Sequence, residues 1–250
     1  MESAWVKKYE QVLANLFVDY QKKFAKNKIG VLVSGGIDSS IIADFVSQNF
    51  RQAKLISLQS EKSVDDDFVE ILSKHLKKIP LLVRVTREDL INIQNEIKKL
   101  LKASNVETNP MQMALASVYY WLFKEANNQG IDTIFTGQGP DILLAGYSKY
   151  RQLSKDNLKQ AIKNDLPLLK IDQARDNAMA KVWGIKIINP YLEKCVVDFC
   201  LFVPAELIIQ NGQEKYLSRA LGKSLKLPKV IVERPKKAMQ YSTGVSKIIK

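Results

Sequence analysis

Short apolar runs of strand-forming residues alternate with helical segments over the first 137 residues of the chain. Strands are expected where aliphatic and β-branched residues lie between turn residues, at 29–33, 54–59, 80–85 and 132–137. Capping and periodicity signals predict helices between them, at 39–46, 65–78, 86–102 and 109–130. This alternation predicts an α/β fold with a doubly wound, mostly parallel sheet, followed beyond residue 150 by a mostly helical C-terminal part.

An amphipathic helix is expected before the first strand, over residues 3–26. Its apolar residues recur at helical spacing, at Trp5, Val6, Tyr9, Val12, Leu13, Leu16, Phe17, Tyr20 and Phe24. Such a stripe either packs on the core or contacts a partner or a second copy, and the sequence leaves both open. We therefore divide the 250 residues into an N-terminal helix, 1–28, and one main domain, 29–250.

Composition excludes several classes of protein. The chain has no run of 18 apolar residues for a membrane span and no signal-peptide pattern at its start, which favours a cytoplasmic location. Cys195 and Cys200 are too few for a disulfide framework or a zinc site, and their spacing predicts two buried thiols on different faces of a helix. The net charge of +12 suits a polyanionic substrate such as ATP, although most of the lysines are spread out as on a solvated surface.

A small polar turn follows the first predicted strand and precedes a helix. Glycines let backbone N–H groups face a ligand, and a helix N-terminus attracts anions, so this turn predicts a phosphate cradle. Its residues are Ser34, Gly35, Gly36, Asp38, Ser39 and Ser40. The turn lacks the Gly-Lys-Ser/Thr of a Walker A loop and the third glycine of a dinucleotide fingerprint. An acid beside bound phosphate indicates Mg²⁺ held by Asp38.

A second glycine-rich turn, TGQGPDILLAGYSKY, follows the fourth predicted strand over residues 136–150. Gly137 and Gly139 permit close approach of the backbone, and Asp141 follows the strand as Asp38 follows the first. The carboxyl ends of parallel strands share one edge of a sheet. We therefore expect Asp38 and Asp141 to hold one Mg²⁺ over a triphosphate.

Four ordered motifs resemble a known family from about residue 29 to the C-terminus. SGGIDSS (34–40) is similar to the pyrophosphate loop of the N-type ATP pyrophosphatases, the PP-loop superfamily. TGQGPDILLAGYSKY, ARDNAMAKVWGIKIINPYLE (174–193) and RPKKAMQYSTG (234–244) resemble segments of the asparagine synthetase C-terminal domain. The chain is thus identified as a member of that family, in a stand-alone form without a glutaminase domain.

The resemblance implies an ATP-dependent ligase that adenylates a carboxylate, with aspartate as the leading candidate, and then forms an amide. Loop 34–40 would bind the leaving pyrophosphate, and Asp38 and Asp141 match the family's Mg²⁺ carboxylates. Lys236 matches the lysine that stabilises the α-phosphate, whereas Arg234 either takes part in catalysis or pairs with a carboxylate. Arg175 and Asn177 are expected as core polar residues bracing the site. Backbone around Leu58, Thr136 and Gly137 would hold adenosine.

The chain departs from the family pattern at several positions. Gln138 replaces a glutamate and cannot act as a base. Lys186 and Ile188 replace a glutamate and an arginine, and Glu193 replaces an aspartate. Because the chain starts Met-Glu rather than with a nucleophilic Cys, we expect ammonia, another amine or a separate glutaminase subunit to supply nitrogen.

Two other functions stay open, and so does a homo-oligomer. One is a tRNA-modifying PP-loop enzyme, which the net charge allows. The cysteines lie far from the loop, however, and no aromatic-and-basic platform for single strands is evident, so nucleic acid is not the expected partner. The other is a nucleotide-binding partner subunit that has lost its chemistry, as Gln138 and Lys186 suggest.

Overall fold

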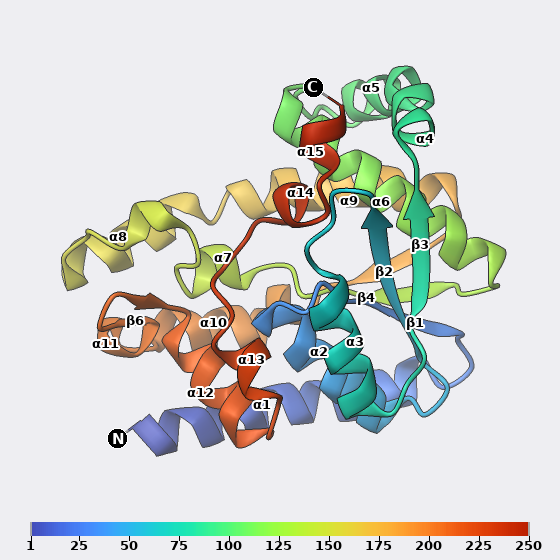
Figure 1. Ribbon diagram of the computed structural model, residues 1–250. Helices are drawn as coiled ribbons and strands as arrows, with labels where there is room; N and C mark the ends of the chain where they lie inside the picture. Colours follow the sequence, from blue (N-terminus) through green and yellow to red (C-terminus); the bar gives the residue numbers. More distant parts are fainter. Residues whose placement is uncertain (1, 250) are drawn as a thin grey trace.

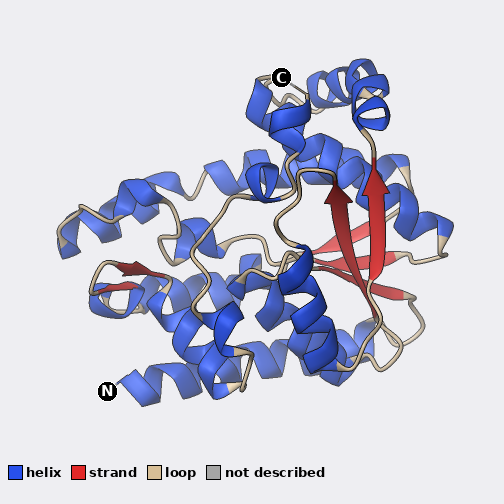
Figure 2. Cartoon of the chain, viewed as in Figure 1, coloured by secondary structure: helices blue, strands red, loops and turns tan. Residues whose placement is uncertain are grey.

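A five-stranded parallel sheet forms the centre of the computed structural model, which describes residues 2–249. The strand order is β3-β2-β1-β4-β5, and every neighbouring pair is parallel. The strands are β1 (Ile29–Leu32), β2 (Lys54–Ser60), β3 (Leu81–Val85), β4 (Thr133–Phe135) and β5 (Lys186–Ile188). Helices cover both faces (Figures 1 and 2), so the predicted doubly wound α/β fold is confirmed.

The strand order creates a switch point between β1 and β4. From β1 the chain adds β2 and β3 on one side, and it then returns to add β4 and β5 on the other. Parallel sheets of this kind open a crevice at such a point, at the carboxyl ends of the two strands. The two glycine-rich turns leave β1 and β4, so both lie at this crevice.

One face of the sheet is covered by α1 (Glu2–Lys23), α2 (Ile37–Asn49), α3 (Asp66–Leu76), α10 (Lys194–Phe202) and α12 (Tyr216–Ser224). The other face is covered mainly by α4 (Arg87–Asn92), α5 (Gln94–Ala103), α6 (Pro110–Asn128), α9 (Leu168–Val182) and α15 (Val245–Ile248). Each layer has its own core of aliphatic and aromatic side chains. Because helices cover both faces of the sheet, all of β1 and the middle of β2, residues 55–58, are buried.

The apolar stripe of α1 packs on the core of the first layer. Val6, Tyr9, Leu13, Phe17 and Tyr20 are buried, and Phe17 stacks on Phe45 and Phe135 with ring centroids 5.3 and 5.6 Å apart. Of the two interpretations of this stripe, core packing is therefore the one that the structure adopts.

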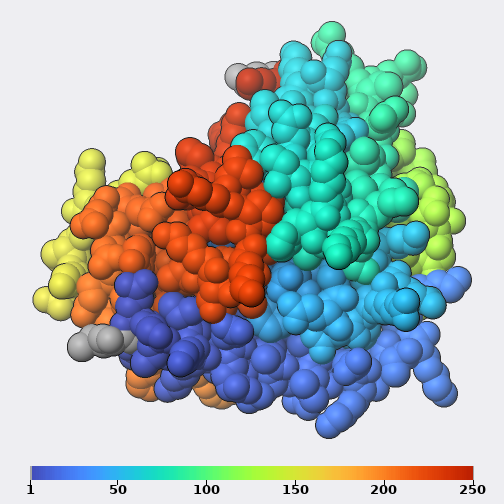
Figure 3. All heavy atoms as spheres, turned by 60° about the horizontal axis from the view of Figure 1, so that its bottom comes forward, coloured from blue at the N-terminus to red at the C-terminus, as the bar shows by residue number. Residues whose placement is uncertain are grey.

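Most remaining elements lie in the C-terminal half: α7 (Pro140–Leu143), a 3-10 turn at Ser148–Tyr150, α8 (Lys155–Asp165), a 3-10 turn at Pro190–Leu192, α11 (Ala205–Ile208), β6 (Ile209–Gln210), β7 (Gln213–Glu214), α13 (Lys229–Val232) and α14 (Met239–Ser242). The space-filling view of Figure 3 shows residues from this end of the chain (red) lying against those of α3 (teal). No helix within residues 2–249 has the length and apolar character that crossing a membrane requires.

Three details of the sequence prediction are wrong. The helix expected over 86–102 is two helices, α4 and α5, because the Gln94 side chain donates to the Leu90 carbonyl at 2.6 Å where a continuous helix would use the backbone N–H. No strand was predicted at β5, which lies in the part of the chain expected to be mostly helical. Cys195 is exposed whereas Cys200 is buried, since five residues along α10 turn the side chains about 140° apart.

Candidate active site

The first turn enters α2 and forms one wall of a cavity at the switch point. Gly35 has a φ of +65°, and a Cβ there would lie 2.3 Å from Phe68 Cβ, so only glycine fits. Ser34, Gly36, Asp38 and Ser39 line the cavity. Ser40 points into the core instead, and its buried hydroxyl has no hydrogen-bond partner among the described residues.

The second turn crosses close over the first. A Cβ on Gly137 would meet the Ser39 backbone nitrogen at 2.7 Å, so the two loops touch backbone to backbone. Thr136 and Gly137 line the cavity with Leu58, which ends the apolar part of β2. These are the residues that the sequence placed around adenosine, and the structure brings them together.

Asp38 and Asp141 meet at the cavity floor around one buried lysine. The Nζ atom of Lys215 forms an ion pair with Asp38 Oδ2 and lies 2.6 Å from Asp141 Oδ1. Lys215 is 3% exposed and has a φ of +55°. Gly146 makes room for it, because a Cβ there would lie 2.2 Å from Lys215 Cε. Sequence analysis missed Lys215, and no local motif marks this one lysine among many.

The three charges shift one another's protonation. Burial raises the pKa of Asp38, against the opposing attraction of Lys215. Burial also acts to raise the pKa of Asp141, but Lys215 and Lys236 outweigh it and hold that pKa below its usual range. Burial disfavours the charged form of Lys215, yet Asp141 and Asp38 together raise its pKa. The lysine therefore stays an ammonium between two carboxylates.

Lys236 contacts the same carboxylate through its other oxygen. Its Nζ lies 3.5 Å from Asp141 Oδ2 and 4.4 Å from the centre of the Tyr147 ring. Two ammonium groups thus converge on Asp141, and both line the cavity beside the serine and glycine turn. Lys215 is neutralised by the two carboxylates, so the less buried Lys236 is the cation placed to meet a phosphate.

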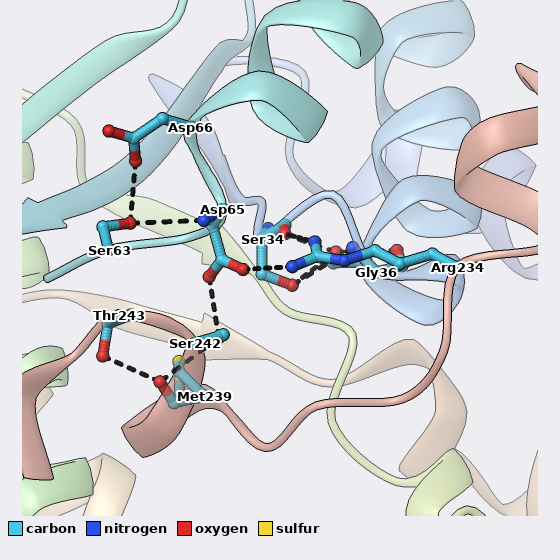
Figure 4. Close-up of polar contacts among 10 residues, drawn as sticks. Ser34, Gly36, Ser63, Asp65, Asp66, Arg234, Met239, Ser242 and Thr243 are labelled. Atoms are coloured by element: carbon cyan, nitrogen blue, oxygen red, sulfur yellow. Dashed lines mark hydrogen bonds and ion pairs between the residues drawn. The ribbon is translucent and has the colours of Figure 1, made fainter.

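Arg234 braces the phosphate turn. Its guanidinium donates to the Ser34 carbonyl at 2.6 Å and to Asp65 Oδ1 at 2.5 Å, and it lies 3.8 Å above the Phe68 ring. Figure 4 shows it reaching between Ser34 and Asp65. Of the two roles that the sequence left open for Arg234, the contacts are those of pairing with a carboxylate.

A second buried cation lies at the α6–α9 end of the cavity. Arg175 donates to Asp176 Oδ1 and Asp172 Oδ1, each at 2.7 Å, and to Gln112 Oε1 at 2.9 Å. Burial raises the pKa of Asp176 to about 6, although Arg175 opposes the shift. Arg175 is thus the bracing core residue that was expected, whereas Asn177 is exposed and the same expectation for it is wrong.

The unusual residues of the sequence lie in two different places. Gln138 lines the cavity, and its Oε1 accepts a hydrogen bond from the Tyr119 hydroxyl at 3.3 Å. Lys186 lies outside the cavity on the edge strand β5, with its Nζ 4.9 Å from the centre of the Phe24 ring. Only Gln138 is therefore placed to meet a substrate.

The carboxylates fit a divalent cation that nucleotide phosphates would complete. Asp38 lines the cavity, and its Oδ1 is buried without a hydrogen-bond partner among residues 2–249, so this oxygen is free to coordinate a cation. Within the same residues no group of three His, Cys, Asp or Glu side chains converges to form a self-sufficient metal site. Asp38 and Asp141 are thus the residues that would hold Mg²⁺, with oxygen ligands of the kind it prefers.

A parallel α/β sheet with a phosphate-type turn and clustered lysines at its switch point defines a nucleotide-phosphate-binding class of protein. The asparagine synthase family model matches residues 18–175 and 166–249, and the chain belongs to that family.

Several curated relatives carry the name asparagine synthetase (glutamine-hydrolyzing). The protein of Methanocaldococcus jannaschii is 28% identical over 259 residues, covering 89% of this chain and 47% of the relative. That of Gallus gallus is 27% identical over 258 residues, covering 96% of this chain and 45% of the relative. The chain therefore spans about half the length of the curated relatives that it matches.

Among solved structures, NMN synthetase from Francisella tularensis aligns with a TM-score of 0.49 at 16% identity, covering 95% of this chain and 76% of the other. A U34-tRNA thiolase from Methanococcus maripaludis aligns with a TM-score of 0.44 at 14% identity, covering 98% and 72%.

Proposed function

We propose that the protein is an ATP-dependent carbon–nitrogen ligase that activates a carboxylate as its adenylate. An oxygen of the carboxylate attacks the α-phosphorus of ATP, and the bond to the β-phosphate breaks to release pyrophosphate. An amine then attacks the acyl carbon, loses a proton and displaces AMP. The names of the relatives favour aspartate as the acid and ammonia as the amine.

Different side chains of the site would take part in different steps of this reaction. The N–H groups and hydroxyls of the turn that contains Ser34 and Ser39 bind the departing pyrophosphate. Lys236 stabilises negative charge at the α-phosphate, since it is a cation placed beside the carboxylate pair. Asp38 and Asp141 would hold Mg²⁺, which when bound neutralises charge on the phosphates.

One observation carries the proposal: Asp38, Asp141, Lys215 and Lys236 converge beside a phosphate-type turn at the switch point of the sheet. The two carboxylates come from loops about a hundred residues apart in the chain and the lysines from its last third. Structural ion pairs alone need no glycine-lined cavity next to them. A site for a metal–nucleotide complex needs both.

The test is a screen for pyrophosphate release from ATP and Mg²⁺ over a panel of carboxylates, aspartate included, with ammonia or with hydroxylamine as a trap. We expect AMP and pyrophosphate in equal amounts, and a hydroxamate with the correct acid. Asp38→Asn should lower the rate at least about a thousandfold, because a metal carboxylate is lost. Asp67→Asn, which changes an exposed carboxylate of α3, is the matched control. Release of ADP and phosphate instead would contradict the proposal.

The same screen separates the two alternatives. ATP binding without turnover over the whole panel would indicate a partner subunit. Tight binding of tRNA that weakens steeply with salt would favour the tRNA-modifying enzyme, as the net charge of +12 allows.

A further inference from the structure

The segment that carries Lys236 is attached to the rest of the protein mainly at its two ends. We call residues 234–243 the strap; in Figure 1 it is the extended red stretch between α13 and α14, together with α14. Within the described chain, the backbone groups of residues 235–237 form no hydrogen bond. The backbone that carries Lys236 is therefore positioned by what holds Arg234 and Ser242, while the Lys236 side chain contacts Asp141 and Tyr147.

One buried carboxylate holds both ends. Asp65 Oδ1 accepts from Arg234 Nη2 at 2.5 Å, and Asp65 Oδ2 accepts from the Ser242 hydroxyl at 2.8 Å. Figure 4 shows Asp65 between the two donors, with one oxygen facing each. Asp65 is 2% exposed, so these charge-assisted hydrogen bonds are shielded from water.

Residues that precede Asp65 form two more hydrogen bonds to the strap. The backbone N–H of Val64 donates to the Ser242 carbonyl at 2.8 Å, and the Ser60 hydroxyl donates to the Thr243 carbonyl at 2.6 Å. These contacts fix the far end only. At the near end, Arg234 is 8% exposed in its side chain and has Asp65 as its carboxylate partner. Without that charge the buried guanidinium would keep the Ser34 carbonyl and the Phe68 ring but no carboxylate, which weakens the near end of the strap.

We propose that Asp65 is a positioning residue for Lys236: by holding Arg234 and Ser242, it keeps the ammonium group of Lys236 beside Asp141. The same carboxylate also braces the phosphate turn, because its partner Arg234 donates to the Ser34 carbonyl. The attachment of the strap follows from the contacts alone. The effect on catalysis rests on the proposed function of Lys236.

Limited trypsin digestion tests the attachment without any need for activity. Trypsin cleaves after Lys236 and Lys237 if the strap leaves its seat, whereas the Arg234–Pro235 bond resists it. Asp65→Asn keeps the shape of the side chain but removes its negative charge, so the buried guanidinium of Arg234 at the near end of the strap loses its carboxylate partner. We expect strap cleavage about tenfold faster than in wild type, measured by mass spectrometry relative to cleavage elsewhere in the chain.

Two further variants make the result decisive. Ser242→Ala removes only the far contact with Asp65 and should speed strap cleavage by a smaller factor, about threefold. Asp67→Asn should leave it unchanged. If Asp65→Asn does not fold, Ser242→Ala alone decides. Equal strap cleavage in wild type and in every folded variant of Asp65 or Ser242 would overturn the proposal, whatever the wild type does with ATP.

Where wild type releases pyrophosphate, kinetics give a second measurement. Because Lys236 acts on charge in the transition state, Asp65→Asn should lower kcat about tenfold and change KM for ATP less than about twofold. A loss confined to KM, with strap cleavage unchanged, would assign Asp65 to nucleotide binding and overturn the positioning role.

Discussion

Asp38 and Asp141 lie at the starts of α2 and α7, directly after the turns that leave the neighbouring strands β1 and β4. The cations that face them come from the helical C-terminal part. We call the first region the acidic half of the site and the second, with Lys215, Arg234 and Lys236, the cationic half. The acidic half is fixed by backbone contact. A Cβ added at Gly137 would lie only 2.7 Å from the Ser39 backbone nitrogen, so no side chain fits between the two loops. The cationic half is fixed by side-chain charges that pair with the acidic half or with Asp65.

The two halves should therefore respond to different kinds of substitution. In the acidic half a small change of volume distorts two loops together, because no flexible side chain lies between them. In the cationic half a change of charge removes the force that positions the group. We therefore expect stability to respond to shape on one side and to charge on the other.

The largest expected effect comes from removing the buried ammonium group. Lys215→Met should lower the free energy of unfolding by about 2–4 kcal/mol without Mg²⁺, since it leaves the largely buried Asp38 without its cation and Asp141 with only Lys236. Urea denaturation measures the loss. Lys223→Met, on the exposed side of α12, is the matched control.

Repeating the urea denaturation with Mg²⁺ tests whether the two carboxylates bind a divalent cation. If the two carboxylates bind a divalent cation, millimolar Mg²⁺ should restore part of the lost stability in Lys215→Met and have a smaller effect in wild type, because binding to the native state alone stabilises it. A variant as stable as wild type in the absence of Mg²⁺ would show that charge does not hold the two halves together.

A shape change in the acidic half should have an effect of nearly the same size. Gly137→Ala places a methyl group against the backbone of Ser39, which cannot move without shifting α2, and should cost about 2–4 kcal/mol. Gly36→Ala is the control, because its Cβ would meet only the Ser34 hydroxyl at 3.3 Å. Equal unfolding midpoints for the two variants would show that backbone contact between the two loops does not hold the acidic half in place.

The smallest expected effect concerns a carboxylate of α2 with no ion pair inside the described chain. Asp44 accepts a hydrogen bond from Gln48 Nε2 at 2.6 Å, and burial raises its pKa to about 6. The folded state thus binds this proton more tightly than the unfolded chain, whose carboxyl has a pKa near 4, and stability from this group falls as pH rises from about 4 to about 6.

Asp44→Asn should therefore stabilise the protein by about 1–2 kcal/mol at pH 7 and have little effect at pH 4. Urea titrations at the two pH values measure this difference. A loss of stability at pH 7 would show that the Asp44 charge is compensated, as that of Asp38 is by Lys215.

Much of the fold was predictable because its signals are local. The Thr86–Asp89 capping box and the Asn109 cap with Pro110 behind it mark helix starts that the structure confirms. The strands β1 to β4 follow from short β-branched runs between turns. The edge strand β5 was missed because three residues of strand give too short a pattern to distinguish from helix.

The sequence by itself determined β1 to β4, the order of strands and helices along the first 137 residues, and the two turns that precede Asp38 and Asp141, because strand runs, glycines and caps act between near neighbours in the chain. Only the tertiary structure decided that Lys215 lies between those aspartates and that Asp65 holds both ends of the strap. Lys215 is 177 residues from Asp38, and Ser242 is 177 residues from Asp65. An ion pair over such a separation depends on how the layers pack, and one lysine among many leaves no mark of it in the sequence.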